Sequence, residues 1–260
     1  MSTEHQVAQF ASKLKTYKKR YLHKRYAELD ESATRLMVNS LLTEVLGYTE
    51  LEDIKTEYQI RGEYADYVIQ LARKKHFVVE VKAVQLDLNE KHLRQSTAYA
   101  ANEGIDWIIL TNGWQIEVYK MIFAKPISTK LLFKLDLNDP NDFKKAPQSL
   151  MLLSKKSILK NELNNFWHRF DALEPKNLAK ALYSAEIIKS LRRMLKTKTG
   201  LTFSENDILD SVHHIITTKG EFIKPKCPIE APKKKVSKKE VIPAFVSSPS
   251  IEIEGNQSTQ

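Results

Sequence analysis

The segment YADYVIQLARKKHFVVEVK, residues 64–82, contains two apolar-rich runs separated by a short basic stretch. Aromatic and β-branched residues dominate both runs, and this composition is typical of β-strands. We therefore predict strands at 64–71 and 76–84, paired as an antiparallel hairpin about Arg73. The hairpin decides the fold, because it forms the middle of the predicted sheet.

Side chains of a strand alternate between the two faces of the sheet. We assume the register that sets Val68 opposite Val78 and Asp66 opposite Glu80. Asp66, Glu80 and Lys82 then share one face, and a slip of one residue would undo this arrangement. The other face is wholly apolar and is expected to pack inward; it carries Tyr67, Ile69, Leu71, Phe77, Val79 and Val81.

Hydrophobic periodicity on either side of the hairpin predicts further helices and strands. Helices are predicted at 4–28, 32–46, 88–102, 155–170, 177–196 and 204–217. Strands are predicted at 55–60, 107–111, 114–119 and 130–135, and Asn112-Gly113 joins two of them as a tight hairpin. The order indicates an α/β protein with a central sheet flanked by helices, followed by a helical C-terminal segment.

Composition limits the class of protein. The chain has 260 residues with a hydrophobic content of 42%, which is ordinary for a globular protein. No apolar run is long enough to span a membrane, and the N-terminus lacks the layout of a secretory signal. The single cysteine suits a reducing compartment, so we expect a cytoplasmic protein.

Charge and composition suggest four regions along the chain. The net charge is +9, yet residues 31–150 are slightly acidic and the basic residues concentrate in the flanks. This distribution fits a cation site within a protein that binds a polyanion, and it fits a merely basic protein as well. We predict a basic helix at 1–30, a core at 31–138, a helical segment at 139–222 and a disordered tail at 223–260.

The polar face of the hairpin suggests metal chemistry. Directly opposed strand residues have Cβ atoms about 4.5–5.5 Å apart, which lets two carboxylates bind one cation. Oxygen ligands favour Mg²⁺, with Mn²⁺ as the alternative. Lys82 lies beside them, where its ammonium could orient or help deprotonate an attacking water, or offset charge on the phosphate. An ordinary solvated sheet face with an ion pair remains the alternative reading of Asp66, Glu80 and Lys82.

These residues resemble the PD-(D/E)xK nuclease pattern, with Asp66, then Glu80-Val81-Lys82, then Gln95-x-x-x-Tyr99. The stretch from Glu31 to Tyr119 is similar to the N-terminal nuclease domain of type I restriction enzyme R subunits and their stand-alone relatives. Leu-Gly-Tyr at 46–48 and Leu-Thr-Asn-Gly at 110–113 belong to the match. The resemblance implies a restriction-endonuclease-like αβββαβ core with a mixed sheet. Alanine, not proline, precedes Asp66.

The resemblance also implies roles for individual residues. Asp66, Glu80 and the carbonyl of Val81 would bind the metal, and Lys82 would be the catalytic lysine. Gln95 and Tyr99 would contact substrate or brace the site, although without that context a helix face packed on the sheet is the better explanation of both. Glu31 sits where such nucleases often carry a further acid, but Glu44 is also available, and an ordinary surface acid on a helix is the alternative reading.

We therefore expect a Mg²⁺-dependent endonuclease that cuts DNA in restriction or anti-phage defence, with RNA as the alternative substrate. The chain lacks a phosphate-binding GxxxxGK loop, so a partner protein would supply motor or recognition functions. The sequence also leaves open whether the protein forms a homo-oligomer. A second class of function is a nuclease-like fold that binds nucleic acid or a partner protein without cutting.

Overall fold

The computed structural model of the protein describes residues 3–60 and 63–217. Within the described residues, the chain divides into two compact units, one before and one after the boundary between Leu163 and Asn164. The first unit therefore includes residues 139–163, which the sequence placed with the helical segment. The predicted tail at 223–260 lies outside the described residues.

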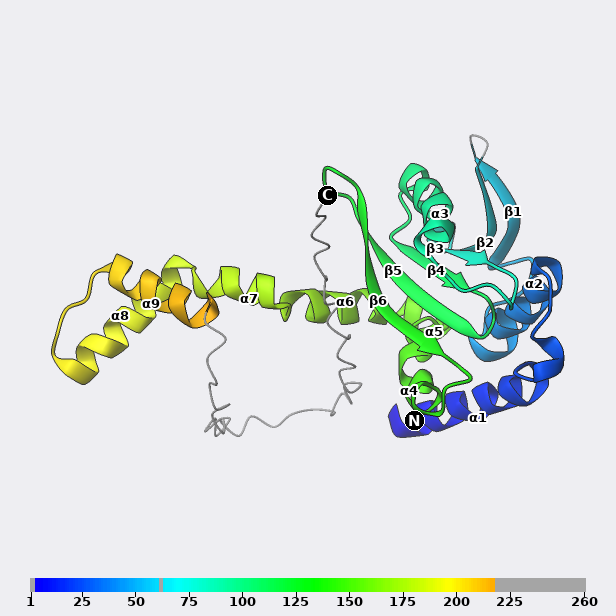
Figure 1. Ribbon diagram of the computed structural model, residues 1–260, viewed down its shortest axis with the longest axis horizontal. Coiled ribbons are helices and arrows are strands. Elements are labelled where there is room, and N and C mark those ends of the chain that lie inside the picture. Colours follow the sequence, from blue (N-terminus) through cyan, green and yellow to red (C-terminus); the bar gives the residue numbers. More distant parts are fainter. Residues whose placement is uncertain (1–2, 61–62, 218–260) are drawn as a thin grey trace, which may run out of the picture. The chain divides into compact units, whose positions relative to one another are not determined.

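The first unit is built on a six-stranded sheet with the strand order β1-β2-β3-β4-β5-β6 (Figure 1). Only β3 and β4 are parallel, and the other neighbouring pairs are antiparallel. The sheet is therefore mixed, as the resemblance to the nuclease domain implied. The strands are β1 Ile54–Ile60, β2 Glu63–Leu71, β3 Lys74–Val81, β4 Trp107–Thr111, β5 Gln115–Ile122 and β6 Ser128–Asp136.

Helices precede, interrupt and follow the strands. The parallel pair requires a crossover, and α3 supplies it between β3 and β4. The helical elements are α1 Thr3–Tyr21, η1 Lys24–Tyr26, α2 Glu31–Ser40, η2 Leu41–Val45, α3 Glu90–Glu103, α4 Pro140–Met151, α5 Lys155–Leu159, α6 Glu162–Ala172, α7 Pro175–Leu182, α8 Ala185–Thr199 and α9 Glu205–Thr217.

The central hairpin has the predicted register. Val68 lies opposite Val78 and Tyr67 lies opposite Val79, while an irregularity at Ile69/Gln70 shifts the pairs nearest the turn. Ala72 and Arg73 form this turn with positive φ angles of 48° and 67°. Two such residues in sequence match the right-handed twist of an antiparallel pair.

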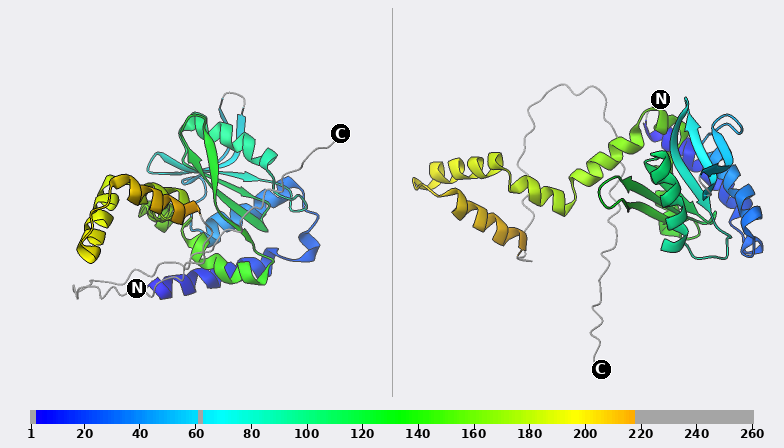
Figure 2. Two further views of the ribbon diagram at one scale, coloured as in Figure 1. Left: turned by 60° about the vertical axis from the view of Figure 1, so that its left-hand side comes forward. Right: turned by 90° about the horizontal axis from the view of Figure 1, so that it is seen from above.

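Both faces of the sheet are covered (Figures 1 and 2). On one face, Val68, Val78 and Leu110 form a core cluster with Leu93 and Tyr99 of α3. The opposite face lies against α1, α2 and η2, and there the ring of Tyr48 packs edge-on against Phe77. The central strands are therefore buried on both sides, which explains their nearly continuous apolar sequence.

The turn between β4 and β5 shows why glycine follows Asn112. Gly113 has a φ of 81°, and a Cβ at this position would lie 1.8 Å from the Met37 side chain of α2. The Asn112 side chain accepts hydrogen bonds from the main-chain N–H groups of Trp114 and Gln115. The predicted Asn-Gly hairpin is confirmed, and its glycine also permits the close approach of α2.

The apolar stripe of α1 packs on the core. Phe10, Leu14 and Tyr17 are buried, and the Tyr17 hydroxyl donates to the carbonyl of Gly113. The helix ends at Tyr21, not at residue 28, because His23 is extended and a 3₁₀ turn follows. This turn leads directly into α2.

Other predicted elements are shorter or divided. β3 ends at Val81, so Lys82 follows the strand, and its main-chain N–H donates to the carbonyl of Thr111. The predicted helix at 155–170 is divided at Asn161, whose φ is 59°. The predicted helix at 177–196 is divided at Ser184, whose side chain caps the N-terminus of α8.

The described part of the second unit is helical. Ile188 of α8 packs with Ile208 and Val212 of α9 in a small core, and Tyr183 is partly buried against them. The Tyr183 hydroxyl also lies 2.8 Å from His213 Nδ1. Across the described residues, every helix is too short or too polar to cross a membrane.

Candidate metal-dependent nuclease centre

Asp66 and Glu80 converge at one end of the central hairpin. Tyr67 lies opposite Val79 in the antiparallel hairpin. Asp66 immediately precedes Tyr67 and Glu80 immediately follows Val79, so both acids lie at the same end. The Asp66 Oδ2 atom accepts a hydrogen bond of 2.7 Å from the main-chain N–H of Val81. This bond fixes the Asp66 carboxylate beside the residue that follows Glu80.

Glu80 is buried beneath α3, with only 2% of its surface exposed. Its Oε1 atom lies 2.6 Å from Lys82 Nζ, and its Oε2 atom accepts a 3.2 Å hydrogen bond from the Ser96 hydroxyl of α3. A buried carboxylate needs such partners, because desolvation of an unpaired charge is costly. The alternative of a solvated sheet face is therefore wrong, although the ion pair that it includes is present.

Lys82 connects the sheet to α2. Its ammonium contacts Glu80 and also lies 3.5 Å from Glu31 Oε2, at the first residue of α2. The side chain is only 15% exposed. Asp30 precedes Glu31 and caps the helix by accepting from the Ala33 main-chain N–H, so the end of α2 that carries Glu31 is well defined.

Arg35, one turn after Glu31, completes the arrangement. Its guanidinium contacts Asp66 Oδ1 through Nε at 2.7 Å and Nη2 at 2.6 Å, and Nη2 also lies 2.8 Å from Glu31 Oε1. We call the five side chains the charged cluster: Glu31, Arg35, Asp66, Glu80 and Lys82. Three carboxylates face two cations, so the formal charge of the cluster is −1.

The electrostatics of the charged cluster reflect burial and mutual charge. Burial raises the pKa of Glu80; Lys82 opposes this shift, and the negative charge of Asp66 adds to it. Burial likewise raises the pKa of Asp66, against the effects of the Val81 hydrogen bond and Arg35. Burial alone would lower the pKa of Lys82, but Glu80 and the other carboxylates raise it. The cluster therefore has an excess of acid that a cation would relieve.

The part of the chain that carries the charged cluster matches a known protein family. Residues 30–130 match the type I restriction enzyme R protein N terminus (HSDR_N). The matched region contains all five residues of the charged cluster, and it indicates a nuclease-related role in restriction. No match was found among curated proteins or among solved structures.

The HSDR_N-like region offers donors that suit a hard divalent cation, since Asp66, Glu80 and Glu31 present carboxylate oxygens only. In the described residues, however, no group of three or more acidic, histidine or cysteine side chains is arranged to hold a metal ion. Arg35 and Lys82 contact the carboxylates instead. The donor set thus fits Mg²⁺ or Mn²⁺ in chemistry, provided that a cationic side chain is exchanged for the ion.

Gln95 and Tyr99 of the HSDR_N-like region differ in burial despite their spacing of one turn. Tyr99 is fully buried in the core cluster beneath α3, whereas Gln95 is exposed. The burial of Tyr99 favours a supporting role in the packing beneath α3. Gln95 lies on the exposed surface of the helix. The residue between them that reaches Glu80 is Ser96.

Glu31 of α2 and Glu44 of η2, the two candidate acids, have different surroundings. Glu31 joins the charged cluster, as the resemblance implied. Glu44 instead pairs with Arg20 of α1 at 2.6 Å, and both of these side chains are about half exposed, at 49% and 50%. Glu44 is therefore a surface residue within an ordinary ion pair.

Sequence reasoning missed Arg35 and the buried Glu117, whereas His92 lies near Gln95 and Tyr99 on the predicted helix. Arg35 had a usable signal, because it follows Glu31 by four residues on a helix. Glu117 of β5 is buried, shares the face of Glu80 across Leu110, and contacts Lys134 at 2.8 Å. His92 of α3 has a buried Nδ1 atom without a hydrogen-bond partner, and burial followed by the charge of Lys82 lowers its pKa.

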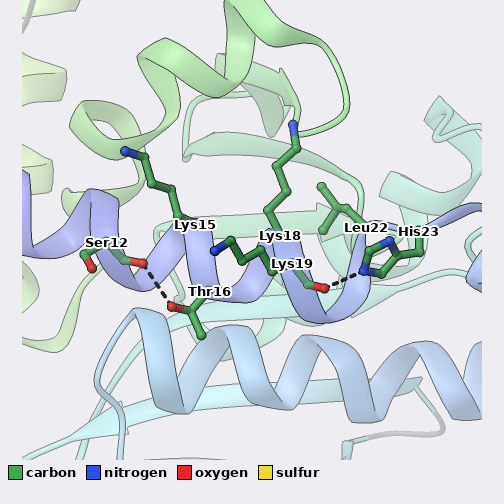
Figure 3. Close-up of a pocket in the computed structure, with 7 residues that line it drawn as sticks. All are labelled: Ser12, Lys15, Thr16, Lys18, Lys19, Leu22 and His23. Carbon is green, nitrogen blue, oxygen red and sulfur yellow. Dashed lines mark hydrogen bonds between the residues drawn. The ribbon is translucent and has the colours of Figure 1, made fainter.

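A surface pocket of about 500 Å³ lies elsewhere, on the outer side of α1 (Figure 3). Lysine side chains extend around it, and one of them, Lys18, donates to the carbonyl of Leu137. Its lining consists of Ser12, Lys15, Thr16, Lys18, Lys19, Leu22 and His23. None of these residues belongs to the charged cluster, so the pocket is separate from the candidate centre.

Proposed function

We propose that the protein is a metal-dependent endonuclease that cuts DNA in restriction or anti-phage defence, and that the charged cluster is its catalytic centre. The observation that supports this most directly is the convergence of Asp66 and Glu80 with Lys82 inside the region that matches the restriction enzyme domain. RNA is an alternative substrate for the same chemistry.

In this proposal, Asp66, Glu80 and the main-chain carbonyl of Val81 would hold Mg²⁺ or Mn²⁺, with Glu31 as a further acid. The ion would supply Lewis acidity toward the phosphate and toward an attacking water. Ser96 holds the Glu80 carboxylate from the side of α3. A carboxylate held in a fixed orientation stabilises a transition state better than a flexible one, because it need not reorient when charge develops.

In this proposal Lys82 would be the catalytic lysine. Its ammonium lies between Glu80 and Glu31, and the raised pKa keeps it protonated at neutral pH. A protonated lysine stabilises negative charge on the phosphate and orients water. We therefore assign Lys82 to charge stabilisation and positioning.

Cleavage of labelled single- and double-stranded DNA and RNA, in Mg²⁺, Mn²⁺ or EDTA, tests the proposal. Glu80→Ala and Lys82→Ala are expected to reduce cutting by about 10²–10³-fold or more. Glu44→Ala is the matched control, because it removes a helical acid from a surface pair and should leave cutting unchanged. Undiminished cleavage by purified Glu80→Ala would remove the charged cluster from the mechanism.

A second function has an observation in its favour. Asp66 and Glu80 contact Arg35 and Lys82, so both carboxylates have cationic partners without a metal. A nuclease-like module that binds nucleic acid or a partner protein without cutting would need no more than this. Salt-sensitive retention of DNA, with no nicking in either metal, is the result that this function predicts.

The proposed endonuclease would work with other components. A partner protein would supply sequence recognition or a motor, since the sequence contains no nucleotide-binding loop of the GxxxxGK type. Self-association is a further possibility for an enzyme that cuts both strands. Co-purification with the products of neighbouring genes and light scattering of the purified chain would test these two proposals.

A further inference from the structure

Arg35 combines a fixed backbone with an accessible guanidinium. Its main-chain carbonyl accepts a 2.8 Å hydrogen bond from the Tyr67 hydroxyl, which ties this turn of α2 to the sheet. Its side chain is 34% exposed, whereas the Asp66 side chain that it contacts is only 9% exposed. The guanidinium can therefore leave Asp66 for solvent without any displacement of α2.

The contact with Asp66 occupies the oxygen that accepts no main-chain hydrogen bond from the described part of the chain. Oδ2 of Asp66 accepts from the Val81 main-chain N–H, and Oδ1 is contacted by two guanidinium nitrogens. A magnesium ion bound at Oδ1 would lie about 2.0–2.1 Å from it. Two cations so close to one oxygen repel each other strongly, because little water separates them. Arg35 and a metal ion thus compete for Asp66.

Lys82 contacts a different carboxylate and is less exposed than Arg35. Its ammonium lies between Glu80 and Glu31 and is mostly buried, so it keeps one carboxylate partner if the other turns to a metal. Arg35 likewise contacts Glu31, at 2.8 Å. Glu31 is therefore available to retain the guanidinium after Asp66 releases it, which keeps Arg35 within the cluster.

We propose that Arg35 is a positioning residue that holds Asp66 in the metal-free protein and is exchanged for the divalent ion when the metal binds. The inference rests on the proposed metal centre. It makes Arg35 a built-in competitor that lowers metal affinity while preventing repulsion among Glu31, Asp66 and Glu80. Removing Arg35 should accordingly strengthen metal binding, whereas removing a metal ligand should weaken it.

Mn²⁺ binding to the full chain without nucleic acid tests this exchange, followed by electron paramagnetic resonance of the free ion. Arg35→Met keeps the aliphatic stem and removes the charge. We expect it to bind Mn²⁺ about fivefold to tenfold more tightly than the wild type, as loss of one partly exposed competing ion pair implies. A purely structural role for Arg35 would produce weaker binding.

Arg20→Met is the matched control. It removes the same charge from an ion pair of the same length, with Glu44, outside the charged cluster. We expect its Mn²⁺ affinity to stay within about twofold of the wild type, because exposed charges at a distance are largely screened by salt. An equal gain in both variants would assign the effect to net charge and would overturn the proposal.

Arg35→Lys covers the case in which Arg35→Met does not fold. It retains the charge but replaces the two-nitrogen contact with a single ammonium, so its Mn²⁺ affinity should lie between the wild type and Arg35→Met. Unchanged or weaker Mn²⁺ binding in a folded Arg35 variant would overturn the exchange.

Glu80→Gln separates failure of this inference from failure of the proposed function. If Mn²⁺ binding is insensitive to Glu80→Gln, the charged cluster is not the metal centre and both ideas fall. If Glu80→Gln removes binding but the Arg35 variants match the wild type, the metal centre stands and only the exchange is wrong.

Discussion

The charged cluster has a buried half and an open half. Glu80 and Lys82, which belong to β3 and the residue after it, have side chains that are 3% and 15% exposed. Glu31 and Arg35, which belong to α2, are 38% and 34% exposed. The contrast indicates that the sheet side holds the charges in place, while the α2 side is open to solvent.

The largest expected effect concerns the packing that supports the buried half. Tyr99→Ala should lower the free energy of unfolding by about 3–5 kcal/mol, because it empties a fully buried aromatic position beneath α3. Gln95→Ala should change stability by less than about 0.5 kcal/mol, since Gln95 is exposed. Urea unfolding measures both, and a similar cost for the two would contradict the difference in burial.

Loss of a cation should affect the two halves unequally. Lys82→Met leaves the buried Glu80 carboxylate without its ammonium and is expected to cost about 3 kcal/mol at pH 7. Arg35→Met exposes Asp66 to water from a more open position and should cost about 1 kcal/mol. Equal costs in chemical denaturation would mean that burial does not distinguish the halves.

Ser96→Ala is a smaller change within the buried half. It removes the hydroxyl that donates to Glu80 at 3.2 Å and leaves the remaining contact with Lys82. We expect a loss of about 1 kcal/mol in thermal or urea unfolding. Thr97→Ala on the same helix turn is a control, because its hydroxyl bonds only to the Leu93 carbonyl within α3. A loss no greater than that of the control would show that Ser96 does not support Glu80.

The smallest effect is a change in pH dependence. Glu80 has a pKa raised above its ordinary value of 4.5, mainly by burial, so the folded protein binds its proton more tightly than the unfolded chain does. Its contribution to stability must therefore decrease as pH rises from about 4.5 through the folded pKa. Relative to Glu80→Gln, the metal-free wild type should lose stability over this range. A relative gain with rising pH would show that the carboxylate form is favoured by folding.

The sequence by itself determined the sheet and the identity of the central acids. Alternation in residues 64–82 fixed which side chains share a face, and the Asn112-Gly113 turn fixed the next hairpin. These are local features, because strand periodicity and turn chemistry operate over a few residues. The same local reasoning extended α1 too far and placed Lys82 inside β3, since the ends of elements depend on caps and on neighbours.

The tertiary structure decided which distant side chains meet. Arg35 reaches Asp66 across 31 residues, Glu31 rather than Glu44 joins the cluster, and the Ser96 hydroxyl of α3 donates to Glu80. Helical periodicity tells which residues share a face, but not the angle or depth at which that face meets the sheet. Those quantities follow from packing among α2, α3 and the strands, and they separate a charge held in the interior from one that can be exchanged.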